Sequence, residues 1–97
     1  MYAKLFLMGF PHYWSEQKLG RFVSAYGSIV AAKIVRAPSG PLALVEMKTL
    51  EEAHNAARGL DGMRLDEELL AVIQGESALG HEVENIFLRL TGHRKAS

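Results

Sequence analysis

Apolar residues along the chain follow two different spacings, and each spacing predicts a different kind of element. Short apolar or β-rich runs bounded by Gly and Pro predict strands, whereas apolar residues three and four positions apart predict amphipathic helices. The runs that predict strands are residues 4–8, 29–35, 42–47 and 69–73. The segments that predict helices are residues 15–26, 50–60 and 81–91. Ser15 and Thr49 are good N-caps for the first two helices.

The elements follow one another in the order strand, helix, strand, strand, helix, strand, and a third helix comes last. This order is that of the ferredoxin-like α+β fold. We therefore expect a four-stranded antiparallel sheet with two helices on one face and an added C-terminal helix. The expected organisation is one domain over residues 1–75, followed by residues 76–97, which contain a connector, the helix at 81–91 and a short basic tail.

The two faces of this sheet can be assigned in advance, because successive side chains of a strand point to opposite faces. The face expected against the first two helices carries Leu5, Leu7, Ile29, Ala32, Ile34, Ala43, Val45, Leu70 and Val72. The opposite face carries Phe6, Met8, Ala31, Lys33, Val35, Leu42, Leu44, Glu46, Ala71 and Ile73. Most of the second set is apolar, and a large exposed apolar patch marks an interaction site. We therefore expect something to cover this face.

The third helix is the first candidate for that cover, because it follows the last strand and has an apolar stripe of its own. The stripe, at positions i, i+3, i+4 and i+7, consists of Val83, Ile86, Phe87 and Leu90. Three interpretations stay open at this point. The helix closes the sheet permanently, it masks the sheet reversibly, or the sheet or helix binds another chain.

Composition narrows the classes of function that the chain can serve. Its 97 residues hold 11 Lys+Arg and 11 Asp+Glu, and this balance argues against strong general binding of polyanions. There is no cysteine, which excludes disulfides and thiolate chemistry. No apolar run approaches the ~18 residues of a membrane span, and the N-terminus lacks the layout of a signal peptide. We expect an intracellular protein, cytoplasmic or nuclear, with no membrane partner.

No group of residues in the sequence indicates catalysis. His81 and Glu82 resemble the start of a helical zinc-protease motif, but Asn85 stands where the second histidine ligand is required. The sequence also lacks a phosphate-binding glycine loop, a dinucleotide fingerprint and a serine-hydrolase elbow. We therefore expect no catalytic residue, no metal site, no cofactor and no enzymatic activity.

Two segments resemble the signature motifs of one known family. Residues 5–11, Leu-Phe-Leu-Met-Gly-Phe-Pro, resemble the first-strand hexamer of the RNA recognition motif, and residues 40–47 lie where its third-strand octamer falls. The residues between and after these motifs fit the family's helices and loops, so that the resemblance covers residues 3–74. It implies a domain that binds single-stranded RNA or DNA by stacking bases on aromatic side chains.

The aromatic positions of the family are only partly kept in this chain. Phe6 matches the first-strand aromatic residue, but Leu42 and Leu44 stand at the two third-strand aromatic positions. A leucine offers no π-face, and stacking on an aromatic residue is worth ~1–3 kcal/mol per base. The resemblance therefore implies weak or atypical nucleic-acid binding.

The residues expected to contact nucleic acid are Lys4, Phe6, Met8, Tyr13, Lys33, Arg36, Leu42 and Leu44. Among them, Lys33 points from the second strand onto the sheet face, and Tyr13 offers a stacking surface in the loop after the first strand. The neighbouring Trp14 is expected to pack against the first helix instead. The other function that the sequence allows is a protein-interaction or homodimerisation module, which would use the apolar sheet face and the C-terminal helix.

Overall fold

The sheet of the computed structural model, which describes residues 2–92, has four antiparallel strands in the order β2-β3-β1-β6. The elements are β1 Ala3–Met8, α1 Glu16–Val23, the 3-10 helix η1 Ser24–Tyr26, β2 Ile29–Ala37, β3 Gly40–Met47, α2 Leu50–Leu60, β4 Arg64–Leu65, β5 Glu68–Leu69, β6 Ala71–Gln74 and α3 Ala78–Leu90. This confirms the expected ferredoxin-like α+β architecture.

The first two helices begin where their N-caps place them. Ser15 Oγ accepts a hydrogen bond from Lys18 N–H, and Thr49 Oγ1 accepts one from Glu52 N–H, each at 3.1 Å. Each bond satisfies an amide that has no partner inside its helix. The cap residues therefore fix the two starting points, as the sequence predicts.

Several element boundaries differ from the sequence prediction by one to three residues. Helix α3 begins at Ala78 rather than residue 81, because Ser77 Oγ accepts the Gly80 N–H at 2.9 Å and caps the helix earlier. Strand β6 begins at Ala71 rather than residue 69, and the polar segment before it forms the short hairpin β4–β5. The first helix ends at Val23 and is followed by η1.

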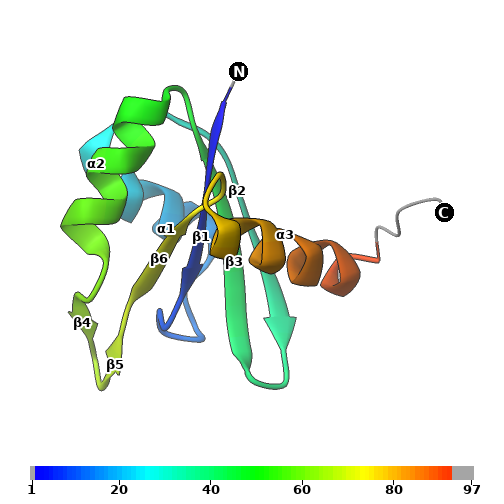
Figure 1. The fold of residues 1–97 in the computed structure, drawn as a ribbon. Coiled ribbons are helices and arrows are strands. Elements are labelled where there is room, and N and C mark those ends of the chain that lie inside the picture. Colours follow the sequence, from blue (N-terminus) through cyan, green and yellow to red (C-terminus); the bar gives the residue numbers. More distant parts are fainter. Residues whose placement is uncertain (1, 93–97) are drawn as a thin grey trace, which may run out of the picture.

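Helices α1 and α2 cover one face of the sheet and α3 lies on the other (Figure 1). The larger core cluster joins α1 and α2 to the sheet side chains that alternation assigns to this face. Its buried members from the helices are Leu19, Val23, Ala53, Ala56 and Leu60, and those from the sheet are Leu5, Leu7, Ala43, Val45, Met47 and Val72. The small alanines of α2 let this helix lie close to the strands.

Both outer edges of the sheet have a backbone N–H that a carboxylate accepts. Glu16 Oε2 accepts Ile34 N–H of β2 at 2.8 Å, and Asp61 Oδ1 accepts Val72 N–H of β6 at 2.9 Å. An occupied edge donor is no longer free to pair with a further strand. Each edge strand therefore has one donor fewer for pairing with a further strand.

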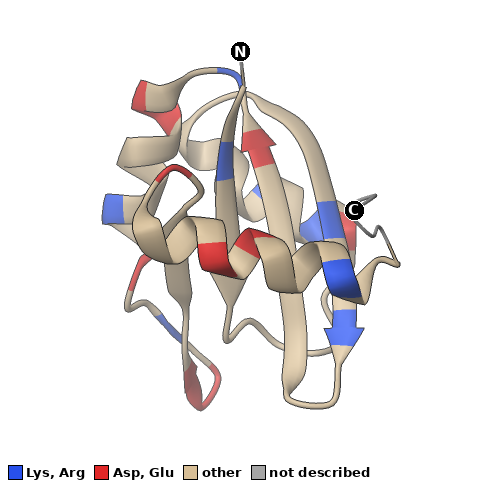
Figure 2. Ribbon diagram, turned by 45° about the vertical axis from the view of Figure 1, so that its right-hand side comes forward, with Lys and Arg blue, Asp and Glu red and all other residues tan. Residues whose placement is uncertain are grey.

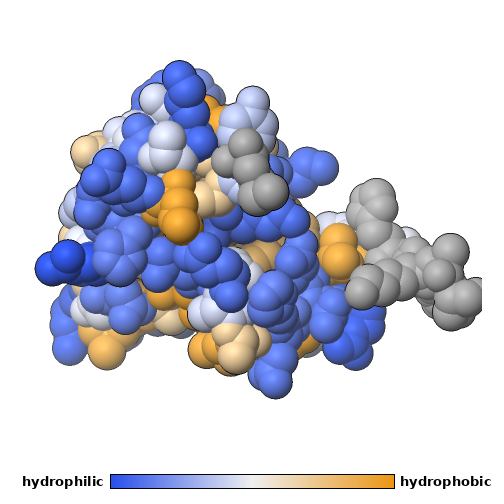
Figure 3. Space-filling model, turned by 45° about the horizontal axis from the view of Figure 1, so that its top comes forward, coloured by the Kyte–Doolittle hydropathy of each residue, from blue (hydrophilic) through white to orange (hydrophobic). Residues whose placement is uncertain are grey.

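The surface at the top of the molecule is mainly hydrophilic, with hydrophobic side chains in separate small patches (Figure 3). Scattered apolar residues of this kind are normal for a protein surface. None of the helices within residues 2–92 combines the length and apolar character that crossing a membrane requires.

Candidate nucleic-acid interface

The sheet face opposite α1 and α2, which we name the outer face, consists of cross-strand rows set by the strand register. Its three rows are Ala31–Glu46–Lys4, then Lys33–Leu44–Phe6–Ile73, then Val35–Leu42–Met8–Ala71. The strands thus place side by side six of the eight residues that the sequence assigns to nucleic-acid contact. Tyr13 and Arg36 lie elsewhere.

Helix α3 covers the apolar part of the outer face, which we name the covered half. Phe6 is fully buried there, and its ring lies 6.0 Å from that of Phe87, tilted by 57°. Leu42 and Val83 are buried with them, and the side chains packed around this cluster are Met8, Val35, Leu44 and Ile73. No base can stack on Phe6 while α3 occupies this position.

Only half of the predicted apolar stripe of α3 faces the sheet. Val83 and Phe87 are buried against it, whereas Ile86 is 46% exposed and Leu90 is 41% exposed. The sequence assigns all four residues to a helix that masks the sheet or binds a partner, and Ile86 and Leu90 are the two that the sheet does not bury. Positions 83 and 87 are one helical turn apart, and a helix that crosses a sheet at one line of contact leaves its flanks in water.

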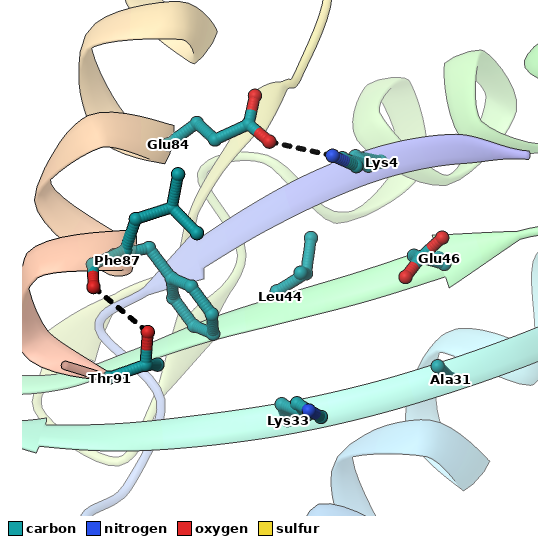
Figure 4. A pocket seen from close by; sticks show the side chains of 9 residues that line it. Lys4, Ala31, Lys33, Leu44, Glu46, Glu84, Phe87 and Thr91 are labelled. Carbon is teal, nitrogen blue, oxygen red and sulfur yellow. Dashed lines mark hydrogen bonds and ion pairs between the residues drawn. The ribbon is translucent and has the colours of Figure 1, made fainter. Parts of the chain in front are cut away.

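Ala31, Lys33 and Glu46, which we name the open half, lie beyond the edge of α3. They line a groove of about 270 Å³. The remaining lining residues are Lys4, Leu44, Glu84, Phe87, Leu88 and Thr91 (Figure 4). The groove therefore has strand residues as its floor and one flank of α3 as its wall.

The charges in this groove are not all available to a ligand. Lys4 Nζ donates to Glu84 Oε2 of α3 at 2.6 Å. Within residues 2–92, neither Lys33 nor Glu46 has a hydrogen-bonded or ion-paired side-chain partner. The basic positions of β2 and of the last turn of α3 lie on the same side of the molecule (Figure 2). Lys33 is thus the available cation of the groove.

Arg36 does not lie on the outer face, and its contact with phosphate stays a prediction. Its guanidinium donates one hydrogen bond to the carbonyl oxygen of His12 and another, at 3.1 Å, to that of Trp14. Strand alternation explains the difference, because Lys33 and Val35 face outward and Arg36 must therefore point to the opposite side. Its role here is to hold the loop after β1.

That loop presents the other aromatic candidate. Tyr13 is 64% exposed, and its hydroxyl donates to Asp66 Oδ2 at 3.0 Å. This hydrogen bond, with some burial and the charge of Asp66, raises the pKa of Tyr13 above its ordinary value. The ring of His12 meets Tyr13 edge-on at 5.6 Å. Trp14 is buried, as expected, with its ring 5.1 Å from Phe22.

A second groove lies on the other flank of α3. It has a volume of about 510 Å³, and its apolar lining residues are Met8, Ala37, Pro38, Pro41, Leu42, Val83, Ile86 and Leu90. Glu68 is its one charged lining residue among those described. This groove therefore lacks the cation that a phosphate contact requires.

The groove of the open half contains five lining residues that the sequence prediction did not include in the site: Ala31, Glu46, Glu84, Leu88 and Thr91. Alternation already assigns Ala31 and Glu46 to the outer face, so that signal was available. The contribution of Leu88 and Thr91 depends on where α3 docks, which no local pattern specifies. Within residues 2–92, no three His, Asp or Glu side chains come together as a metal site.

Comparisons with known proteins agree with this architecture. The RNA recognition motif of Rna15 with bound RNA (GU) superposes with a TM-score of 0.69 at 22% identity, covering 87% of this chain and 96% of the other. The Sex-lethal RNA recognition domains 1 and 2 from Drosophila melanogaster give a TM-score of 0.69 at 20% identity, covering 77% and 50%. The RRM3 domain of Mip6 gives 0.68 at 20% identity, covering 75% and 92%. No curated protein sequence matches the chain.

The sequence itself carries the family's pattern over most of its length. The family model of the RNA recognition motif matches residues 5–70, a segment that runs from β1 to the residue before β6 and includes α1 and α2. Helix α3 lies outside the matched segment. With the topology, the strand register and this match in agreement, the chain belongs to the RNA recognition motif family.

Proposed function

We propose that this domain binds single-stranded RNA weakly, through the open half of its outer face, and that it is not an enzyme. The observation that carries the proposal is the groove beside α3, which combines an available cation, Lys33, with the apolar floor of Leu44. A phosphate pairs with a cation, and the face of a base packs on an apolar surface. The family membership and the RNA in the Rna15 structure support the same class of ligand.

Two features limit the affinity. Helix α3 buries Phe6 in the covered half, so that no base can stack on its ring. The leucines at positions 42 and 44 offer no aromatic surface in its place. The formal net charge is zero, so that long-range attraction of a polyanion is small. Binding by this domain is therefore weak and dependent on salt.

An amide NMR titration of the full chain with a degenerate single-stranded RNA heptamer tests the proposal. The expected result is a set of shifts at Ala31, Lys33, Leu44 and Glu46 that weakens as salt is added, because bound phosphates release counterions. A DNA heptamer measures whether the 2′-hydroxyl contributes. Shifts confined to residues 12–14 would place the site on the loop, and an unchanged spectrum would overturn nucleic-acid binding.

A second candidate function, protein interaction or homodimerisation, is favoured by one specific observation. Ile86 and Leu90 expose apolar surface beside the second groove, where Glu68 would oppose a phosphate. Analytical ultracentrifugation over a range of concentrations measures self-association directly. A mass that stays monomeric at the highest concentration, together with unchanged Ile86 and Leu90 side-chain signals, would exclude the homodimer.

A further inference from the structure

The carboxylate of Glu46 lies in the groove without the partner that its position in the sheet provides. Lys4 and Glu46 are directly opposite each other on β1 and β3, the arrangement in which opposite charges pair across an antiparallel sheet. Lys4 Nζ instead bonds to Glu84 of α3, at 2.6 Å. On the other side of Glu46, the register places Ala31, whose methyl group cannot donate a hydrogen bond.

The docked α3 is therefore the reason that a hydrogen-bond acceptor remains available in the groove. Lys33, on the neighbouring row, supplies positive charge near the same surface. A phosphate group would be repelled by a carboxylate, so Glu46 does not serve the RNA backbone. It can serve only a part of the ligand that presents a hydrogen-bond donor, and the donors that differ from one nucleotide to the next are the N–H groups of the bases.

The four RNA bases differ in the donors that they present to a carboxylate. Guanine offers two neighbouring donors, N1–H and the N2 amino group, which match the two oxygens of a carboxylate. Cytosine and adenine each offer one exocyclic amino group. Uracil offers a single N–H between two carbonyl oxygens, and these oxygens are repelled by negative charge.

We propose that Glu46 makes this groove selective for bases that carry an amino group, with guanine preferred and uracil disfavoured. The inference rests on the proposed function, since it names the base that the same groove accepts. In the bound state, the base lies against Leu44, its amino group donates to Glu46, and Lys33 neutralises the neighbouring phosphate. Hydrogen bonds to an ionised acceptor are about twice as strong as neutral ones, which makes Glu46 the main source of discrimination.

Four RNA heptamers test the proposal, all uridine except for the central nucleotide, which is G, C, A or U. We measure their affinities by NMR titration and fluorescence anisotropy at low salt. The expected result is binding of the G heptamer about tenfold tighter than the U heptamer, with C and A between them. Shifts of Lys33 and Leu44 in each titration report that the heptamer occupies the groove.

The Glu46→Gln variant identifies the residue that reads the base. A carboxamide both donates and accepts, so it pairs with uracil as well as with guanine, and the preference is expected to fall below about twofold. Glu51→Gln is the matched control: it removes the same charge from an exposed position at the start of α2, and it should keep the wild-type preference. Thermal unfolding of both variants confirms that they fold.

The outcomes separate this inference from the function on which it rests. Equal affinity for all four heptamers, with shifts at Lys33, would overturn the selectivity and leave RNA binding in place. A preference for guanine that survives in Glu46→Gln would also overturn it, because another group would then read the base. Absence of any binding by the wild-type chain would overturn the proposed function itself.

Discussion

The covered and open halves of the outer face belong to the same strands but have opposite surroundings. In β1, Phe6 is fully buried, while Lys4, two positions earlier on the same face, reaches the groove and pairs with α3. In β3, Leu42 is buried and Glu46 lines the groove. The comparison shows that position on the face does not decide whether a side chain is available. Helix α3 packs on apolar residues of the outer face, and the charged residues Lys33 and Glu46 line the groove beside it.

Two interactions hold α3 on the sheet, apolar burial and an ion pair, and they differ in the free energy that they contribute. An aromatic side chain such as Phe87 buries about 200 Å², which corresponds to about 5 kcal/mol of gross apolar stabilisation before ordering entropy is subtracted. The ion pair between Lys4 and Glu84 has partly exposed side chains, and such pairs contribute about 0–1 kcal/mol. Apolar burial in the covered half therefore contributes most of the free energy that holds α3 on the sheet, and the ion pair contributes little.

The largest expected effect comes from removing the ring that closes the covered half. Phe87→Ala should lower the free energy of unfolding by about 3 kcal/mol, because the ring is 3% exposed and packs on Phe6. Loosening α3 also exposes Phe6, so RNA affinity should rise. Urea unfolding followed by circular dichroism measures the first effect, and anisotropy with a fluorescent RNA measures the second.

Leu79→Ala is the matched control for this experiment, because Leu79 lies in the same helix with an exposed side chain. A surface substitution of this kind changes stability by about 0.5 kcal/mol or less. If Phe87→Ala were as mild as Leu79→Ala, the covered half would not depend on α3.

The next effect concerns the open half alone. Lys33→Ala should weaken RNA binding several-fold at low salt and reduce the slope of log affinity against log salt by about 0.7, the value for one phosphate contact of a single strand. Lys48→Ala removes the same charge from an exposed residue that does not line the groove, and it should retain the wild-type slope. Equal slopes in the two variants would remove Lys33 from the interface.

A smaller effect lies at the boundary between the halves. Glu84→Gln removes the charge that pairs with Lys4 and should lower the free energy of unfolding by less than about 1 kcal/mol. The difference from wild type should shrink in high salt, because exposed charges are screened there. A loss of stability that is large and independent of salt would mean that Glu84 holds α3 by packing rather than by charge.

Much of the difference between the covered and open halves was predictable from the sequence. Alternation assigned Phe6, Leu42 and Lys33 to one face, and the apolar excess of that face indicated that it would be covered. The docking line of α3 was not predictable, since the stripe at positions 83, 86, 87 and 90 fits more than one rotation of the helix. Packing against Phe6 selects the rotation that buries Val83 and Phe87. This orientation of α3 forms the groove and leaves Glu46 without a partner.

Arg36 shows that backbone groups compete for a side chain to which the sequence assigns a ligand. Its charge suggested a phosphate contact, but the carbonyl groups of His12 and Trp14 need donors, and the side of β2 on which Arg36 lies brings it to them. Charge alone is a weak guide where backbone groups compete for the same side chain. The alternation that located Phe6 correctly would have located Arg36 as well.

The smallest expected effect is at Tyr13, which lies outside both halves of the outer face. The hydrogen bond to Asp66 raises the pKa of Tyr13 in the folded chain above 10.0. Because the folded state then holds this proton more tightly than the unfolded state, the resulting stability is fully present below pH 10.0 and is lost as pH rises through the folded pKa. Carbon NMR shifts of the Tyr13 ring against pH measure that pKa.

Asp66→Asn provides the control, since asparagine tolerates the positive φ of 56° at this position and removes the charge next to the hydroxyl. In this variant the pKa of Tyr13 should return toward 10.0, its ordinary value. The ring signals of Phe6 should stay the same in both proteins through the titration, because the covered half contains no titrating group. Movement of Phe6 together with Tyr13 would show that the loop and the covered half open as one unit, and the two halves would then not be independent of the loop that Arg36 holds.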